Sequence, residues 1–367
     1  MRKTLSKKYL IATIIALLLI IAATIKGIYD WRRFINTPLI PAALYVDYQF
    51  YPKHTIKDLA KDLHALGYLN EPYKLIWLAH LYGFNKKLRT GEYRFNGGTK
   101  PLELLEKIIS GKVLMRSFVI IEGWNFQQVL TALKHAPQLS QQISALSTPQ
   151  IMNKIARVNI HPEGLFFPAT YRYTWGDSDV GLLKWSYRLM QRRLNKEWQG
   201  RAHNLPYTSA YEALIAASLI EKETALSNER PLIAAVIINR LAKNMPLQID
   251  PTIIYGLGLN YNGKLHKADL QSNTLYNTYL NKGLPPTPIA IPSLDSIHAA
   301  LHPAKTDVLY FVAKAKGEAG HQFSQTYQQH ERAVVEYKNA LSPRQNKPAN
   351  VKAKVTTLPK TDLKHAK

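Results

Sequence analysis

Apolar residues follow three patterns along the 367-residue chain. An uncharged apolar run fills residues 9–25. From residue 45 to residue 340, segments with apolar positions at helical spacing alternate with short β-branched runs. Residues 341–367 are rich in Pro and Lys and poor in apolar side chains, which is typical of disorder. The pattern predicts a transmembrane helix, a folded α+β region and a disordered basic tail.

The folded region divides into a small and a large unit. The small unit, residues 45–112, contains three helical segments and a short strand that ends at a Gly-Gly turn. Its third helix has Pro101 in the first turn, where proline is tolerated. The large unit, residues 113–340, begins with a strand over residues 116–121 and a helix that Asn125 can cap. It continues as mixed α+β structure.

The N-terminal run decides the expected compartment. A transmembrane helix needs about 20 apolar residues, and residues 9–29 can supply them. Residues 1–8 carry four positive charges and no negative one, which places the N-terminus in the cytoplasm. We therefore expect a single-pass anchor, a linker over residues 30–44, and the folded units outside the cytoplasm. A cleaved signal peptide is the alternative, but no clear small-residue cleavage site follows the run.

Basic residues greatly outnumber acidic ones. The chain has 48 Lys and Arg against 25 Asp and Glu, a net charge of +23, and no Cys. No recognisable nucleic-acid-binding module accompanies this charge, so lipid headgroups or an anionic polymer are the simpler partners. The lack of Cys excludes disulfides, thiol chemistry and zinc sites built on Cys.

Two glutamates lie in an apolar helical segment that begins with the capping pattern Ser209-x-x-Glu212. Glu221 and Glu223 each fall three or four residues from apolar positions, so periodicity does not choose between them. A carboxyl in an apolar site has a raised pKa and can act as a general acid near neutral pH. The alternative is a structural ion pair with a neighbouring base such as Arg230.

Three further groups carry possible chemistry. Gln248 and Asp250 precede a Pro-Thr turn, where Asp250 can equally act as a helix cap. His298 and His302 are spaced to share a zinc ion on one helix face, but no H-E-x-x-H motif and no third ligand is evident, so we expect no metal site. His321 is a weaker candidate for a cleft residue.

Five blocks of the sequence resemble one known family. In chain order they are "IIEGWNFQQV", "PEGLFFPATY", "ASLIEKETALSNERPLIAAVIINRLAKNMPLQIDPTIIYGLG", "YNTYLNKGLPPTPIA" and "AGHQFSQTYQQH". Residues 45–340 are thereby similar to the YceG-like, or MltG, endolytic murein transglycosylases of bacteria. Small departures from the family's usual sequence are Ala169 in place of Asp, Ala319 before Gly320, and Thr287, Ile291 and Ser293 in the proline-rich loop.

The resemblance implies a lyase in the bacterial inner membrane with its catalytic domain, residues 113–340, in the periplasm. It would cleave the β-1,4 bond between N-acetylmuramic acid and N-acetylglucosamine inside peptidoglycan strands and leave 1,6-anhydro ends. One Glu serves as acid and then base, with the sugar's 6-hydroxyl as nucleophile, so neither cofactor nor metal is expected. Residues 45–112 would form a LysM-like glycan-binding module.

The resemblance also assigns residues and partners. The family's catalytic glutamate is the first of the E-K-E pair, which is Glu221 here. The expected substrate-binding residues are Gln248, Asp250, Thr252, Tyr255, Tyr276, Asn277 and Glu223, with Glu163 as a cleft residue or a helix cap. Peptidoglycan strands and the inner membrane are the expected partners, cell-wall synthases are a further candidate, and nucleic acid is not expected. A role in terminating nascent glycan elongation also follows from the resemblance.

Two other functions stay open at this point. One is a membrane-anchored scaffold that binds glycan and cell-wall synthases without turnover. The other is a hydrolase that uses water and a second carboxyl such as Asp250. The mass of the products separates lyase from hydrolase, because an anhydro end is lighter by one water.

Overall fold

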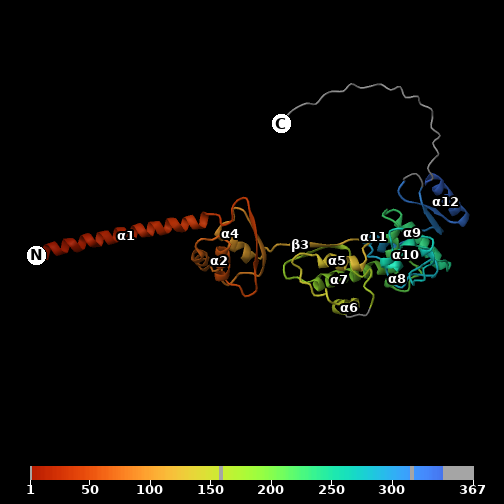
Figure 1. Cartoon of the computed structure of the whole chain (residues 1–367), viewed down its shortest axis with the longest axis horizontal. Helices are drawn as coiled ribbons and strands as arrows, with labels where there is room; N and C mark the ends of the chain where they lie inside the picture. The colour runs from red at the N-terminus through yellow and green to blue at the C-terminus, as the bar shows by residue number, and fades with distance from the viewer. Residues whose placement is uncertain (1, 157–159, 315–317, 342–367) are drawn as a thin grey trace, which may run out of the picture.

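A computed structural model describes residues 2–156, 160–314 and 318–341. Figure 1 shows a long helix, a small module and a larger unit following one another, with α12 at the far end. The structure has the mixed α+β character that the sequence predicts. The predicted disordered tail, from residue 342 to the C-terminus, lies outside the described residues.

The N-terminal helix α1 (Arg2–Asn36) is long and apolar enough to cross a membrane. An 18-residue window within Lys7–Asn36 has a mean hydropathy of 2.5 and is not buried, features that a single-pass anchor shares with a signal sequence. The sequence predicted a linker over residues 30–44, but α1 continues to Asn36. The reason is packing, because the last turns of α1 place Trp31, Phe34 and Ile35 against the core of the small module.

The small module pairs two antiparallel strands with three helices. Strand β1 (Tyr45–Phe50) pairs with β2 (Gly91–Asn96), and Tyr48 lies opposite Tyr93. The helices are α2 (Ile56–Ala65), α3 (Pro72–Leu81) and α4 (Pro101–Ser110). Their apolar faces and the strands enclose one core, which includes Leu59, Leu63, Leu75, Phe95 and Leu104. The LysM-like identity of this module stays a prediction.

The larger unit begins with a second strand pair and three helices. Strand β3 (Arg116–Ile120) pairs antiparallel with β4 (Ala169–Tyr173), and the helices are α5 (Phe126–Lys134), α6 (Thr148–Ala156) and α7 (Asp179–Gln199). The predicted cap of α5 is confirmed, because the side chain of Asn125 accepts a hydrogen bond from the Gln128 amide at 2.9 Å.

Helix α8 (Ala210–Glu223) lies at the centre of the larger unit. It packs against α7, α9 (Arg230–Ala242), α10 (Asp250–Leu257) and α11 (Leu294–Leu301). Every residue of α8 from Ala213 to Ile220 is buried, as expected for a helix that is apolar on all sides. The chain between α10 and α11 is loop-rich, with short 3₁₀ turns at Gly258–Asn260 and Asp269–Gln271.

A hairpin and a last helix complete the described chain. Strand β5 (Tyr310–Ala313) pairs antiparallel with β6 (His321–Ser324), and α12 (Tyr327–Leu341) packs against both strands. Phe311 and Phe323 from the hairpin contact a small apolar cluster that includes Ala235 and Val236 of α9. This contact packs the hairpin against α9, the helix that follows α8.

Gly164 offers a test of how tightly the loop before α11 packs. Its φ of +75° is strained for other residues, and an added Cβ would lie 2.6 Å from Pro288. Gly176 has a similar φ of +92° but open space around it. We expect Gly164→Ala to cost about 1 kcal/mol more than Gly176→Ala, because only the first adds a clash to the backbone strain. Chemical denaturation of both variants measures the difference, and equal losses would contradict the packing.

Candidate active site

The two glutamates at the end of α8 face different parts of the molecule. An α-helix turns about 100° per residue, so side chains two positions apart point about 200° away from each other. Glu221 therefore faces the N-terminus of α11, and Glu223 faces a pocket beside α10 and the hairpin. This geometry separates two residues that the sequence pattern treats alike.

Glu221 is held by hydrogen bonds at the start of α11. Its Oε2 atom accepts from the Ser293 amide at 2.9 Å, from the Ser293 hydroxyl at 2.5 Å and from the Ser296 hydroxyl at 2.6 Å. Its Oε1 atom lies 3.9 Å from a guanidinium nitrogen of Arg230. The side chain is only 8% exposed. These donors lie at the N-terminus of α11, where the helix dipole favours a negatively charged acceptor.

Glu223 lines a pocket of about 310 Å³. The lining comes from four helices, two loops and the hairpin: Glu223, Arg240, Leu247, Gln248, Asp250, Tyr279, Phe311, Val312, Ala313, His321 and His330. Ligand pockets usually combine apolar and aromatic walls with a few polar groups that converge on the ligand. The aromatic, charged and amide side chains of this lining have that character.

The Glu223 carboxyl has no hydrogen-bond or ion-pair partner among the described residues. Burial, together with the negative charge of Asp250, raises its pKa to about 7. The group is therefore divided between its protonated and ionised forms near neutral pH. An acid with this pKa can donate a proton and, once ionised, take one back.

Hydrogen bonds order several of the polar residues that line this pocket. Asp250 accepts from the Tyr279 hydroxyl at 2.6 Å. Gln248 adopts a φ of +53°, uncommon outside glycine, and its side chain accepts from Arg240 at 3.1 Å. Arg240 also donates to the carbonyl oxygens of Leu247 and Leu309. Strained backbone of this kind is often found at functional sites.

A histidine from the hairpin is oriented toward the same pocket. His321 Nδ1 lies 2.8 Å from Glu229 Oε2, and the His321 amide donates to Glu229 Oε1 at 2.6 Å. Burial opposes the ionisation of Glu229, but the contacts with His321 and Thr224 outweigh it and lower the pKa of Glu229. This pairing fixes the ring of His321, the residue that the sequence offered only as a weaker candidate.

Three of the predicted residues form a separate cluster. Glu163 accepts from the Phe126 amide at 2.9 Å and from the Tyr255 hydroxyl at 3.0 Å, so it caps α5 and joins it to α10. Tyr255 contacts Tyr276 edge-on, and the Tyr276 hydroxyl lies 2.8 Å from that of Thr287. Burial raises the pKa of Glu163 to about 7. The cap, one of the two roles left open by the sequence, is thus present.

Two other predicted residues are buried and fully used by the protein. Thr252 donates to the Ile249 carbonyl at 2.6 Å and contacts Thr278. Asn277 donates to the carbonyls of Leu270 and Ser272 and accepts from the Tyr279 amide. Neither lines the pocket, so the geometry gives their predicted substrate contacts no support. They order the loops that carry Asp250 and Tyr279.

Sequence reasoning missed Tyr279, Arg240 and His330 in the pocket lining. Tyr279 and His330 lie inside two blocks that carry the family resemblance, so those blocks contained a usable signal. Arg240 also lies inside one of the blocks, although an Arg near the end of an apolar helix usually faces solvent. It is buried, and its guanidinium donates to the carbonyl oxygens of Leu309, just before β5, and of Pro246 and Leu247.

Comparisons with known proteins agree with this description. Residues 49–336 match the model of the YceG-like family. The match covers most of the chain, and the chain belongs to this family. The blocks quoted from the sequence therefore identified the family correctly.

Relatives and a solved structure are similar over long ranges. An endolytic murein transglycosylase of Bacillus subtilis is 34% identical over 268 residues, which are 68% of this chain and 73% of that protein. One from Streptococcus pneumoniae is 26% identical over 366 residues, 90% of this chain and 66% of that protein. The chain thus spans slightly less than two thirds of the pneumococcal protein. The crystal structure of a YceG-like protein from Listeria monocytogenes superposes with a TM-score of 0.50 at 27% identity, covering 79% of this chain and 99% of that one.

The contacts of Glu221 predict a structural cost for its removal. Glu221→Ala leaves the donors of Ser293, Ser296 and Arg230 without their acceptor in a largely buried site, and we expect a loss of about 2–4 kcal/mol in the free energy of unfolding. Glu212→Ala, at the exposed start of the same helix, removes only a capping contact and should cost about 1 kcal/mol. Chemical denaturation compares the two. Equal losses would mean that Glu221 does not anchor α11.

Proposed function

We propose that the chain is an endolytic lytic transglycosylase of peptidoglycan. It cleaves the β-1,4 bond between N-acetylmuramic acid and N-acetylglucosamine within glycan strands and leaves 1,6-anhydro ends. Family membership and the names of the relatives support the reaction class. The observation that carries the proposal is the carboxyl of Glu223, which has no protein partner and a pKa of about 7 in a polar and aromatic pocket.

The geometry favours Glu223 over Glu221 as the acid. The resemblance assigned that role to Glu221, the first glutamate of the pair. Yet Glu221 accepts three hydrogen bonds on one oxygen and lies beside Arg230, so its carboxyl is already engaged by the protein. Glu223 has the opposite environment. When two carboxyls have such different surroundings, they commonly take different roles, one structural and the other chemical.

The proposed reaction needs one carboxyl for two proton transfers. Protonated Glu223 donates its proton to the glycosidic oxygen as the C1–O bond of the muramic acid residue breaks. The resulting carboxylate takes the proton of the 6-hydroxyl while that oxygen bonds to C1. The atoms balance without water, and the acid returns to its starting form. The negative charge of Asp250, beside Glu223 in the pocket lining, would stabilise positive charge developing on the sugar ring.

A water-using hydrolase is the closest rival. Asp250 shares the pocket with Glu223, and two carboxyls suffice for ordinary glycoside hydrolysis. The Tyr279 hydroxyl occupies one oxygen of Asp250, which favours an electrostatic role over that of a base that activates water. A scaffold without turnover is less favoured, because it gives no reason for an unpartnered acid in a pocket.

The proposal includes a place in the cell. Helix α1 would anchor the chain in the inner membrane with its N-terminus in the cytoplasm, which leaves the catalytic domain in the periplasm beside newly made glycan. Cleavage inside strands at that position would terminate elongation, and cell-wall synthases are the corresponding protein partners. The small module would contribute glycan binding without chemistry.

The choice of acid predicts opposite results for two isosteric substitutions on one helix. Glu223→Gln removes the transferable proton and should lower the rate of anhydro-muramyl product formation by about 10²–10⁴-fold or more, because one group serves both transfers. Glu221→Gln should remain within about tenfold of the parent if the fold is kept. Mass spectrometry of products from purified peptidoglycan gives both rates. If Glu221→Gln is inactive and Glu223→Gln active, the resemblance placed the acid correctly and the geometric argument fails; products heavier by one water would support the hydrolase instead.

The pKa of Glu223 predicts the pH dependence of the reaction. Only the protonated acid can donate, so kcat/KM should fall about tenfold per pH unit above pH 7. Glu163 has a similar pKa but is bound to Tyr255, so Glu163→Gln is the matched control and should keep this descending limb. A limb that disappears in Glu163→Gln, or a rate that stays constant to pH 9, would contradict the assignment.

A further inference from the structure

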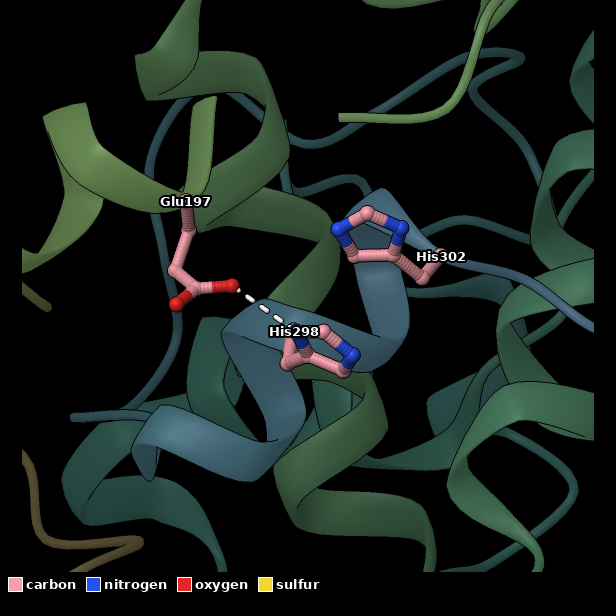
Figure 2. Close-up of side chains that lie close together, drawn as sticks. All are labelled: Glu197, His298 and His302. Carbon is pink, nitrogen blue, oxygen red and sulfur yellow. Dashed lines mark hydrogen bonds and ion pairs between the residues drawn. The ribbon is translucent and has the colours of Figure 1, made fainter. Parts of the chain in front are cut away.

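Three side chains with metal-binding atoms converge on the far side of α11 from Glu221. Glu197 comes from the last turn of α7, and His298 and His302 come from the end of α11. One ligand atom from each residue lies within 4.8 Å of the others. Figure 2 shows the carboxylate and the two rings turned toward one another. The proposed catalytic pocket uses none of these residues.

The two histidines are held as a pair by the helix. They are four residues apart, and their rings stack with centroids 4.3 Å apart and planes 27° from parallel. His302 closes the helix, where its amide donates to the His298 carbonyl at 2.8 Å.

Glu197 completes the group from a separate helix. Its Oε2 atom lies 2.8 Å from His298 Nδ1, and the Ala202 amide donates to the Leu301 carbonyl at 3.0 Å just beyond it. Leu194 of α7 and Leu301 of α11 belong to the same core, so the two helices are fixed before any ligand binds. The ring of His302 has no hydrogen-bond partner among the described residues. The ring of His302 is therefore available to bind a metal ion beside the hydrogen-bonded pair of Glu197 and His298.

We propose that Glu197, His298 and His302 bind a divalent transition-metal ion, with Zn²⁺ as the best fit. Two imidazole nitrogens and one carboxylate oxygen are a ligand set that zinc takes in proteins, and His298 is 59% exposed, which leaves a fourth position for water. Ligand atoms around tetrahedral zinc lie about 3.3 Å apart, given bonds of about 2.0 Å. The present separations need only small side-chain rotations to reach this value.

Binding would clamp α7 to α11. The first residues of α11 also hold Glu221 through Ser293 and Ser296, so the ion would brace a helix that orders the end of α8. The spacing of His298 and His302 allowed a shared metal ion, but the third ligand could not be found in the sequence, because Glu197 and His298 are 101 positions apart. The expectation of no metal site rested on the lack of a third ligand, which the fold supplies. This inference does not depend on the proposed enzymatic function.

Titration calorimetry of the untagged full-length chain in detergent, first treated with EDTA, tests the site with ZnCl₂ as the probe. We expect one Zn²⁺ per chain with a Kd of about 10 μM or tighter and a rise of a few degrees in Tm at saturating zinc. His298→Ala, His302→Ala and Glu197→Gln should each weaken binding at least about tenfold. His266→Ala, which removes an exposed histidine elsewhere, is the matched control and should bind like the parent.

Two results would overturn the proposal. In one, the parent binds no more zinc than a variant that lacks both His298 and His302. In the other, His266→Ala weakens binding as much as His302→Ala does, which would indicate unspecific binding to surface histidines. His298 is exposed, so His298→Ala separates loss of a ligand from loss of folding, and the Tm of each metal-free variant checks that the fold is kept.

Discussion

The arrangement of the larger unit depends on one constraint, which is the burial of helix α8 from Ala213 to Ile220. A helix that is apolar on all sides must be enclosed, and α7, α9, α10 and α11 enclose it. Only its ends can then carry charged groups. The C-terminal end carries Glu221 and Glu223, at the place where α11 and the hairpin β5–β6 approach it from different directions. The position of both acids at the end of an apolar helix is therefore a consequence of the fold.

The two carboxyls differ because of what surrounds them. Glu221 meets the amide and hydroxyl of Ser293 and the hydroxyl of Ser296, so its charge is compensated by the start of a helix. Glu223 is shielded from solvent and meets the negative charge of Asp250, and both effects raise its pKa. Since residues two apart on a helix diverge, a single turn places one acid in a structural role and the other in a pocket. The proposed zinc ion would act at the opposite end of α11, on the same helix that binds Glu221.

Local signals in the sequence predicted a large part of the fold. The cap at Asn125 and the start of α4 at Pro101 were recognisable, because they depend on a few neighbouring residues. Strands β1, β4 and β6 were missed, since a short strand is defined by a distant partner and β4 lies in a segment rich in Pro and aromatic residues. Gln248 and Asp250 were expected near the substrate and do line the pocket, whereas Thr252 is buried beneath it. The surroundings of the two glutamates could not be predicted, because their neighbours are distant in the sequence, such as Ser296, which lies 75 positions from Glu221.

The central claim is that burial and the negative charge of Asp250 raise the pKa of Glu223 to about 7, so that its carboxyl is partly protonated near neutral pH. Carboxyl ¹³C NMR of the protein labelled at the glutamate side chains, titrated from pH 4 to pH 9, measures this directly. The account predicts two signals that titrate near pH 7, one lost in Glu223→Gln and the other in Glu163→Gln. If Glu223→Gln removes no signal that titrates in this range, Glu223 is an ordinary ionised carboxylate, and the division of roles at the end of α8 is wrong.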